Sequence, residues 1–237
     1  MKISLIIPMY NESKIIEDTA KCLSDYMSSN FDNYEILFSD DGSKDNSAKL
    51  VESLDLPCVR VVGYQDNRGK GSAVRHAMLH TDGDIRIFTD ADLAYGLDVI
   101  KRAISMLTEN EGASILIGSR NLGKDGYEGY TFIRKLMSKI YIKVLCFAGR
   151  FKLSDSQCGF KAFRGEAANR IFSKCKINGF AFDFEAIMWA TRLGETIIEM
   201  PVKIINHRDS TVRPINDAIA MLKDVRRIRK SIKSNKN

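Results

Sequence analysis

The sequence has no long apolar run, few cysteines and only three histidines in 237 residues. Its longest stretch without a charged residue is the nine residues from Ile3 to Asn11, whereas a membrane-spanning helix needs about 20 apolar residues. The five cysteines are odd in number and show no C-x-x-C spacing, which argues against a zinc ribbon and a disulfide framework and favours reduced thiols. A strand-like pattern starts at residue 3 without a cleavage site after it, so we expect a cytoplasmic protein with no secretory signal.

The charge of the chain is unevenly distributed. Residues 223–237 contain seven basic residues and one acid, so their net charge of +6 equals that of the whole chain. Residues 131–152 contain six basic residues and no acid, so the rest of the chain is net negative. Two basic surfaces on a neutral-to-acidic body predict an anionic partner, either membrane lipid or nucleic acid.

The first half of the chain alternates short apolar runs with helical patterns. We predict helices over residues 12–28, 43–54 (capped by Ser43), 69–80 and 97–109. Strands are predicted over residues 3–8, 34–39, 59–62, 85–89 and 113–117. This alternation is typical of βαβ units, and it predicts an α/β fold in which helices flank a Rossmann-like, mostly parallel sheet.

The second half has a less regular pattern. An amphipathic helix is predicted over residues 132–148 and a turn with a short strand over 155–163. Helices from 166 and over 183–192, a strand over 197–200 and a last helix from about 215 follow. Because no repeat or low-complexity linker interrupts the chain, we expect one domain over residues 1–213 and a basic, membrane-facing amphipathic helix over 214–237.

Polar residues follow each of the five strands predicted in the first half. Ligands of parallel sheets bind beyond the carboxyl ends of the strands, so these segments are expected to line one crevice. The segments are P-M-Y-N-E (8–12), S-D-D-G-S (39–43), D-N-R-G-K-G (66–71), T-D-A-D (89–92) and G-S-R (118–120). Such convergence is hard to obtain from core packing alone and predicts a binding site.

Asp90 and Asp92 flank one alanine directly after a predicted strand. Mg²⁺ and Mn²⁺ prefer oxygen ligands, commonly one or two carboxylates together with substrate phosphates. A D-x-D pair alone is a weak signal because it also occurs in solvated turns. Here the pair shares its crevice with Asp40 and Asp41, and four neighbouring acids repel unless a cation or hydrogen-bond donors compensate them. We therefore predict a divalent metal at Asp90 and Asp92.

The motifs together resemble family 2 glycosyltransferases of the GT-A fold. The motifs that carry this resemblance are P-x-Y-N-E (8–12), D-D-G-S (40–43), N-x-G-x-G (67–71), D-A-D (90–92) and G-S-R (118–120). Two more, D-S-Q-C-G-F-K (155–161) and A-F-D-F-E (181–185), resemble the branch that glycosylates polyprenyl phosphates. The resemblance implies an inverting, metal-dependent hexosyltransferase that uses a nucleoside diphosphate sugar. The last two motifs look closer to the glucosyl than to the mannosyl branch, which favours UDP-glucose as donor.

The resemblance also implies which residues meet the donor. Carboxylates suit ribose hydroxyls and ring N–H groups because ionised oxygens only accept hydrogen bonds. The residues expected to bind the donor or shape its pocket are Pro8, Tyr10, Glu12, Asp40, Asp41, Asn67 and Asp90. Many related synthases carry a glutamine metal ligand two residues after the second aspartate, whereas this chain has Ala94 there. Either water and diphosphate complete the coordination of Mg²⁺ or Mn²⁺, or the metal binds weakly.

A second implied group of residues would hold phosphates near the reacting atoms. The candidate catalytic residues are Asp92, Arg120, Arg134, Ser138 and Lys161. Arg134 and Ser138 lie one helical turn apart on the polar face of the predicted helix, so both can reach one phosphate. Of His207, Arg208 and Arg213, we expect Arg208 to bind a phosphate.

A phosphate acceptor removes the need for a general base. A sugar hydroxyl must lose a proton when it attacks, whereas a phosphate monoester, with a second pKa of about 6, is already anionic. The metal and Arg120 would neutralise the leaving diphosphate while basic side chains hold the attacking phosphate in line. Asp183 and Glu185 are then expected to orient Lys161 or the sugar, or else to be solvated at a helix N-terminus.

A polyprenyl phosphate acceptor also explains the basic segments. Amphipathic basic helices lie at membrane interfaces, and each basic residue near anionic lipid contributes about 1 kcal/mol. The helix around Arg134 to Lys143 and the tail from Lys223 are therefore expected to hold the crevice against a bilayer. We expect a peripheral protein on the cytoplasmic face of a membrane.

Other functions stay open on the sequence alone. They are a GDP-mannose-dependent polyprenyl-phosphate mannose synthase, and a family 2 transferase that acts on a saccharide hydroxyl in cell-surface polysaccharide synthesis with Asp183 as base. A nucleic-acid-binding protein is disfavoured because no helix-turn-helix, zinc-finger or RNP signature is present. His76 and His80 are four residues apart, but with one other histidine in the chain they are interpreted as surface residues.

Overall fold

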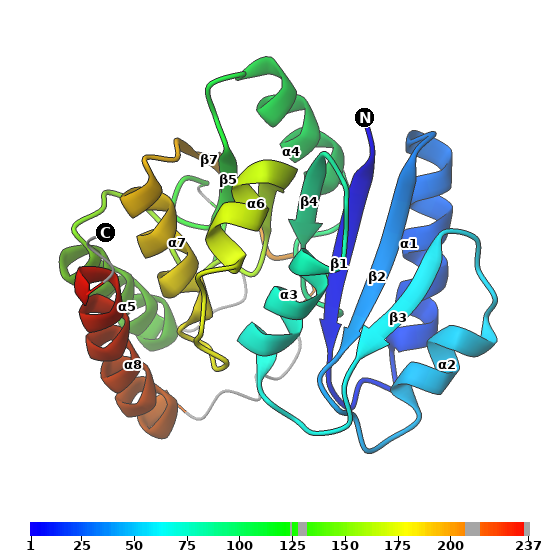
Figure 1. Cartoon of the computed structure of the whole chain (residues 1–237), viewed down its shortest axis with the longest axis horizontal. Helices are drawn as coiled ribbons and strands as arrows, with labels where there is room; N and C mark the ends of the chain where they lie inside the picture. Colours follow the sequence, from blue (N-terminus) through cyan, green and yellow to red (C-terminus); the bar gives the residue numbers. More distant parts are fainter. Residues whose placement is uncertain (124, 128–131, 207–213, 235–237) are drawn as a thin grey trace.

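The computed structural model describes residues 1–123, 125–127, 132–206 and 214–234, and it contains a seven-stranded sheet with helices on both faces (Figure 1). The strands are β1 (Ile3–Met9), β2 (Tyr34–Asp40), β3 (Val59–Gly63), β4 (Ile85–Phe88), β5 (Ile115–Ser119), β6 (Lys161–Arg164) and β7 (Ile197–Pro201), in the sheet order β3-β2-β1-β4-β6-β5-β7. Strand β6 runs antiparallel to β4 and β5, and the other neighbours pair in parallel. The predicted mostly parallel α/β sheet is confirmed.

The helices divide between two hydrophobic cores, one on each face of the sheet. They are α1 (Ile16–Asn30), α2 (Ser47–Ser53), α3 (Lys70–Leu79), α4 (Asp98–Glu109), α5 (Phe132–Gly149), α6 (Gly165–Phe172), α7 (Phe182–Leu193) and α8 (Pro214–Ser234). Helices α1, α2 and α4 cover the first core, and α3, α6 and α7 cover the second. Successive side chains of a strand point to opposite faces, so Leu5 and Ile7 of β1 enter the first core and Ile6 enters the second.

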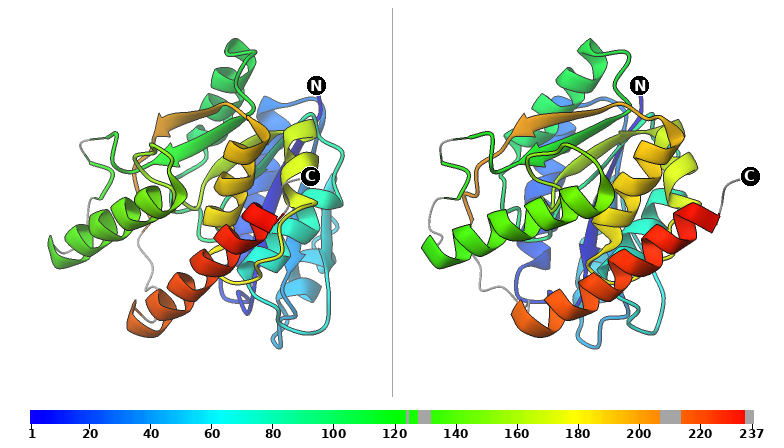
Figure 2. Two further views of the ribbon diagram at one scale, coloured as in Figure 1. Left: turned by 60° about the vertical axis from the view of Figure 1, so that its left-hand side comes forward. Right: turned by 90° about the vertical axis from the view of Figure 1, so that its left-hand side faces the viewer.

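Helix α8 packs on the protein through its apolar face. Val225, Ile228 and Ile232 are buried in the second core, where α8 contacts α5 and α7 (Figure 2). The prediction that this apolar face is available to a membrane is therefore wrong for these residues, because their surface is already buried against neighbouring helices. The basic residues of α8 between 226 and 233 remain exposed.

One predicted element differs from the structure. Helix α2 starts at Ser47, not at a cap on Ser43, because the Ser43 hydroxyl donates to Asp40 at 2.5 Å. The turn and short strand predicted over residues 155–163 are present as a turn that brings Asp155 against Arg120, followed by β6. The other predicted strands and helices are present, with ends shifted by a few residues.

Candidate active site

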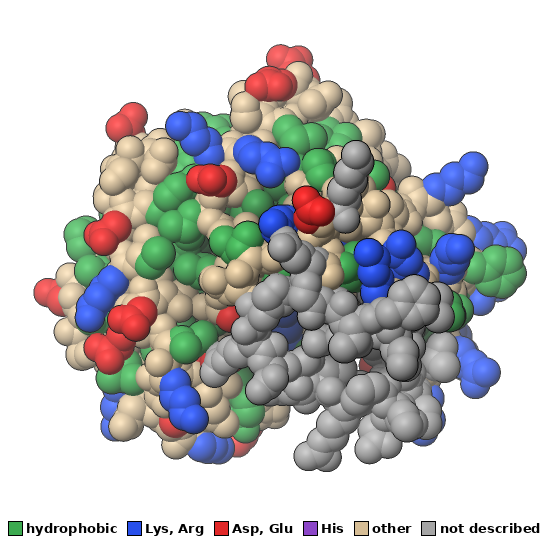
Figure 3. Space-filling model, turned by 180° about the vertical axis from the view of Figure 1, so that it is seen from behind, with side chains coloured by type: hydrophobic (Ala, Val, Ile, Leu, Met, Phe, Trp, Pro, Cys, Tyr) green, Lys and Arg blue, Asp and Glu red, His purple; other side chains and the backbone are tan. Residues whose placement is uncertain are grey.

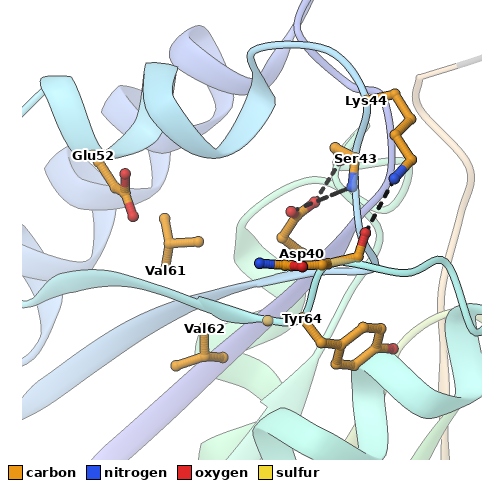
Figure 4. Close-up of a pocket in the computed structure, with 9 residues that line it drawn as sticks. Asp40, Ser43, Lys44, Glu52, Val61, Val62 and Tyr64 are labelled. Carbon is orange, nitrogen blue, oxygen red and sulfur yellow. Dashed lines mark hydrogen bonds between the residues drawn. The ribbon is translucent and has the colours of Figure 1, made fainter.

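An open pocket lies at the carboxyl ends of β2 and β3 (Figure 4). It has a volume of about 580 Å³ and is lined by Asp40, Ser43, Lys44, Glu52, Val61, Val62, Gly63, Tyr64 and Gln65. The Asp40 carboxylate accepts hydrogen bonds from the hydroxyl and the backbone N–H of Ser43, and Lys44 Nζ donates to the backbone oxygen of Gln65 at 3.2 Å. Asp40 is only partly buried, so its carboxylate keeps acceptor capacity for a ribose or a base.

Asp41 holds the loop after β3 in place. Its buried carboxylate accepts hydrogen bonds from the Tyr64 hydroxyl (2.6 Å), the Asn67 side-chain amide (3.0 Å), and the backbone N–H groups of Arg68 (3.0 Å) and Gly69 (2.8 Å). Gly42 has a φ of +71°, and a Cβ there would lie 2.7 Å from the backbone nitrogen of Asn67, so the turn requires glycine. The D-D-G-S and N-x-G-x-G motifs thus form one structure, in which Asp41 and Asn67 join the exit of β2 to the loop after β3, and Asp41 also holds the pocket residue Tyr64. Direct contact of either residue with a donor stays a prediction.

The exit of β1 joins the same edge of the sheet. Pro8 is buried in β1, Tyr10 has 43% of its surface exposed, and the backbone N–H of Glu12 donates to Ser47 Oγ at 2.8 Å. These positions do not test the predicted contacts with the nucleotide. The Tyr10 side chain is exposed enough for a nucleotide to reach it.

Asn11 fastens the β1 exit to the β2 exit, a function that sequence reasoning missed. Its side-chain oxygen accepts the backbone N–H of Lys44 at 2.8 Å, and its own N–H donates to Ser43 Oγ at 2.9 Å. Asn11 adopts a φ of 55°, a left-handed conformation that asparagine tolerates better than most residues. The asparagine inside P-x-Y-N-E was the available signal.

Asp90 and Asp92 lie directly after β4. The Lys70 ammonium, at the start of α3, contacts Asp90 Oδ1, and the two side chains are 28% and 30% exposed. Asp92 Oδ1 accepts the backbone N–H of Ala94 at 3.1 Å. Since Gly69 is bonded to Asp41 and Lys70 to Asp90, residues 69–70 bring the exits of β2 and β4 together. Burial lowers the pKa of Lys70, but the charge of Asp90 outweighs it and the pKa is raised.

The metal prediction rests on two carboxylates. Within the described ranges, no group of three or more His, Cys, Asp or Glu residues is placed to hold a metal ion. Mg²⁺ is commonly bound through one or two carboxylates, with water and substrate phosphates completing its coordination. The donor set of Asp90 and Asp92 therefore fits a metal that arrives with a diphosphate.

Gly159 lies against the Asp90 carboxylate, another contact that sequence reasoning missed. A Cβ at Gly159 would lie 2.1 Å from Asp90 Oδ2, so this position admits only glycine unless Asp90 moves. The Gly159 N–H donates to the hydroxyl of Tyr95 at 3.1 Å. Burial raises the pKa of Tyr95 well above its ordinary value, so that hydroxyl stays protonated. The glycine of C-G-F-K thus helps to place Asp90.

Lys161 and Asp183 form a buried ion pair of 2.6 Å, and Lys161 is 1% exposed. Lys161 Nζ also donates to the backbone oxygen of Cys158 at 2.7 Å. Burial raises the pKa of Asp183, and the charge of Lys161 opposes that shift. Lys161 is a buried residue of an inner strand, because β6 lies between β4 and β5. The expected contact between Asp183 and Lys161 is present.

Glu185 has a structural function at the start of α7. It is 2% exposed, and its carboxylate accepts the backbone N–H groups of Lys176 and Ile177 at 2.8 and 2.7 Å. The alternative that Asp183 and Glu185 are solvated is therefore wrong, since both carboxylates are buried and bonded.

Arg120 is paired with an acid that sequence reasoning did not identify as its partner. Its Nε donates to Asp155 Oδ2 at 2.6 Å and its Nη2 to Asp155 Oδ1 at 3.0 Å, a bidentate ion pair in which Asp155 is fully buried. Burial lowers the pKa of Arg120, but the Asp155 carboxylate outweighs it and the pKa is raised well above its ordinary value. Binding of a diphosphate by Arg120 stays a prediction.

The remaining predicted phosphate ligands fall outside the described contacts. Arg134 and Ser138 lie in α5, but their side chains are not among those described, and His207, Arg208 and Arg213 lie outside the described residues. Asn206 lies beside the D-A-D turn, because its Nδ2 donates to the backbone oxygen of Asp92 at 3.1 Å.

Helix α5 presents apolar and basic side chains on its outer surface. Ile140, Val144 and Phe147 are 54%, 44% and 88% exposed, and Lys139 and Lys143 beside them are exposed as well. Figure 3 shows basic side chains beside hydrophobic ones at this edge of the molecule. Every helix in the part of the chain that the structure describes is too short or too polar to cross a bilayer.

Comparison with known proteins gives one consistent result. The family described as "Glycosyl transferase family 2" matches residues 4–172. A dolichyl-phosphate β-glucosyltransferase of Dictyostelium discoideum is 33% identical, over 96% of this chain and 73% of the relative. The enzyme of the same description from Homo sapiens is 29% identical, over 96% of this chain and 75% of the relative.

Solved structures show the same fold. Glucosyl-3-phosphoglycerate synthase from Mycobacterium tuberculosis, in complex with Mn²⁺, UDP and phosphoglyceric acid, superimposes with a TM-score of 0.70 at 21% identity, over 98% of this chain and 78% of that one. Its complex with Mg²⁺ and UDP gives a TM-score of 0.66 over 98% of this chain and 79% of that one. The GT-A fold expected from the motifs is therefore confirmed.

Proposed function

The chain belongs to glycosyl transferase family 2, and from that premise we propose that it transfers glucose from UDP-glucose to a polyprenyl phosphate with inversion at the anomeric carbon. The observation that carries this proposal is the junction at residues 69–70, which joins the nucleotide-sized pocket at Asp40 to the carboxylates at Asp90 and Asp92. The similarity to dolichyl-phosphate β-glucosyltransferases over almost the whole chain supports both the donor and the class of acceptor.

Asp40 and the pocket walls would bind the nucleoside, while Asp90 and Asp92 would hold Mg²⁺ or Mn²⁺. A bound divalent cation supplies charge stabilisation to the leaving diphosphate. The solved relatives of the same fold that bind Mn²⁺ or Mg²⁺ with UDP support this assignment. The protein's own contribution is to fix the Asp90 carboxylate against Gly159 and Lys70, and the Asp92 carboxylate on the backbone N–H of Ala94.

The state of Asp183 favours a phosphate acceptor. A hydroxyl acceptor requires a base that is free to take a proton, and Asp183 is held by Lys161 at 2.6 Å. A phosphate acceptor needs orientation and neutralisation, which basic side chains supply. The residues proposed to position the donor diphosphate and the acceptor phosphate are Lys161, Arg120, Arg134, Ser138 and Arg208.

The proposed site would work at a membrane surface. The exposed ridge of Ile140, Val144 and Phe147 on α5, flanked by lysines, matches an interfacial helix with its apolar side in the bilayer. The exposed basic residues of α8 add attraction to anionic lipid. In this proposal residues 1–213 form the catalytic domain, and residues 214–237 attach it electrostatically to the cytoplasmic face.

A donor panel tests the proposal. The full chain is incubated with UDP-glucose, GDP-mannose or UDP-galactose, a polyprenyl phosphate, and Mn²⁺ or Mg²⁺, and butanol-extractable sugar is counted. We expect transfer from UDP-glucose alone, and the product should be a β-linked glucosyl lipid. Addition of EDTA should abolish product formation. A folded chain that transfers no sugar from any donor overturns the proposal, and transfer from GDP-mannose alone moves it to the mannosyl branch.

A further inference from the structure

Lys70 occupies an unusual place for a cation, against one of the two carboxylates assigned to the metal. Its ammonium contacts Asp90 Oδ1, and the carboxylates of Asp183 and Asp92 add to the negative potential around it. Asp183 already has its own partner in Lys161. Lys70 therefore compensates the negative charge of Asp90 in this structure.

The backbone that carries Lys70 is fixed, so a change of partner involves the side chain alone. Gly71 N–H donates to the backbone oxygen of Asn178 at 2.7 Å, and Gly69 N–H donates to Asp41 at 2.8 Å. Arg75, one turn further along α3, donates to the Asn178 side chain at 2.7 Å. The Lys70 side chain is 28% exposed and has a flexible four-carbon chain, so its ammonium can move away from Asp90.

We infer that Lys70 is a built-in counter-cation that a divalent metal must displace from Asp90, and that it then binds the diphosphate of the donor. This inference rests on the proposed function, which puts the metal at Asp90 and Asp92. An ammonium and a divalent cation on one carboxylate repel each other, and the repulsion is relieved when a diphosphate arrives between them. Metal binding is consequently weak in the free protein and strong in the presence of the nucleotide, which prevents the site from filling without a donor.

Mn²⁺ binding to the full chain tests this inference without any turnover. The spectroscopic signal of free Mn²⁺ is followed by electron paramagnetic resonance during titration, with and without UDP. For the unaltered chain we expect UDP to tighten Mn²⁺ binding. Lys70→Met should bind Mn²⁺ alone at least about tenfold more tightly than the unaltered chain, and UDP should enhance its binding less.

Two further variants separate charge from shape. Lys70→Arg keeps the positive charge and should keep Mn²⁺ binding weak without UDP, and Lys70→Gln should behave like Lys70→Met. Lys101→Met, at an exposed position on α4, removes the same charge away from the site and should leave both titrations unchanged.

The outcomes distinguish the inference from the function on which it rests. If Lys70→Met and Lys70→Gln bind Mn²⁺ alone no more tightly than the unaltered chain, Lys70 is not a competing cation and the inference is overturned, while the metal site stands. If the unaltered chain binds no Mn²⁺ even with UDP, the metal site of the proposed function fails, and the inference fails with it.

Discussion

The crevice has a proposed donor side, at the exits of β1 to β4, and a proposed acceptor side, at Arg120 and Lys161, and the two sides are built by different means. On the donor side, loops after β1, β2 and β3 are joined by hydrogen bonds to backbone groups, with Asp41 and Asn11 as the organisers. On the acceptor side, buried ion pairs join distant segments, Arg120 with Asp155 and Lys161 with Asp183. The comparison teaches that the donor pocket is shaped by local turns, whereas the acceptor side depends on electrostatic compensation between elements.

Asp92→Asn is expected to have the largest effect, because it weakens the metal ligands of the donor side. Loss of charge stabilisation on the leaving diphosphate should reduce kcat/KM for UDP-glucose by about a thousandfold. Glucosyl transfer is measured with polyprenyl phosphate at saturating Mn²⁺. Asp98→Asn, an exposed acid at the start of α4, is the matched control, and wild-type turnover by Asp92→Asn contradicts the metal assignment.

Lys161→Met breaks the acceptor side at its buried ion pair. Removing one partner leaves Asp183 buried and uncompensated, so the free energy of unfolding should fall by about 3–5 kcal/mol in urea titrations. Asp183→Asn and the double variant complete a double-mutant cycle. The double variant should lose less free energy of unfolding than the two single variants lose in sum.

The stability loss in Lys161→Met should depend on pH. Lys161 lowers the pKa of Asp183, so its removal raises that pKa further above the unfolded value of 3.8. A carboxyl whose folded pKa is raised binds its proton in the native state, and stability therefore falls as pH rises from the unfolded value through the folded one. The loss should be smaller at about pH 4 than at about pH 7, and a loss that is equal at both pH values argues against a buried, uncompensated Asp183.

Gly159→Ala sharpens the link between the two sides, because Gly159 belongs to the acceptor motif and touches Asp90 of the donor side. The added methyl group must push the Asp90 carboxylate aside, and Mn²⁺ affinity in the presence of UDP should fall by about tenfold. Gly112→Ala is the control, since nothing lies within 4 Å of its Cβ position. Equal Mn²⁺ affinity of both variants removes Gly159 from the account.

Phe147→Ser is expected to have the smallest effect. It removes the most exposed apolar side chain among those described on α5, at 88%, and should weaken binding to anionic vesicles by about fivefold in co-sedimentation without changing the thermal stability. Leu79→Ser, 41% exposed at the end of α3, should leave vesicle binding unchanged. If both variants bind vesicles equally, α5 is not the side that meets the membrane.

The same comparison explains what the sequence could and could not predict. Strand exits and their polar motifs follow from local periodicity, which is why the sequence alone predicts that the loops after β1 to β3 and the D-A-D turn lie at the carboxyl edge of the sheet. Turn chemistry misled the prediction at Ser43, whose hydroxyl has Asp40 as a closer partner than a helix N-terminus.

The pairing of Arg120 with Asp155 could not be predicted in the same way, and orientation of Lys161 was only one of the functions expected of Asp183. Arg120 lies 35 residues from Asp155, and Lys161 lies 22 residues from Asp183. Nothing in local periodicity specifies which buried acid compensates which base, and the antiparallel insertion of β6 decides it. Lys70 and Gly159 were missed for the same reason, since both act on Asp90 from other elements.

A crystal structure with Mn²⁺ and UDP-glucose tests the central claim most directly, through the anomalous scattering of manganese. We predict one peak about 2.2 Å from carboxylate oxygens of Asp90 and Asp92, with the nucleoside in the pocket at Asp40 and the Lys70 ammonium moved off Asp90. A manganese peak elsewhere, or a nucleotide bound away from this edge of the sheet, contradicts the account.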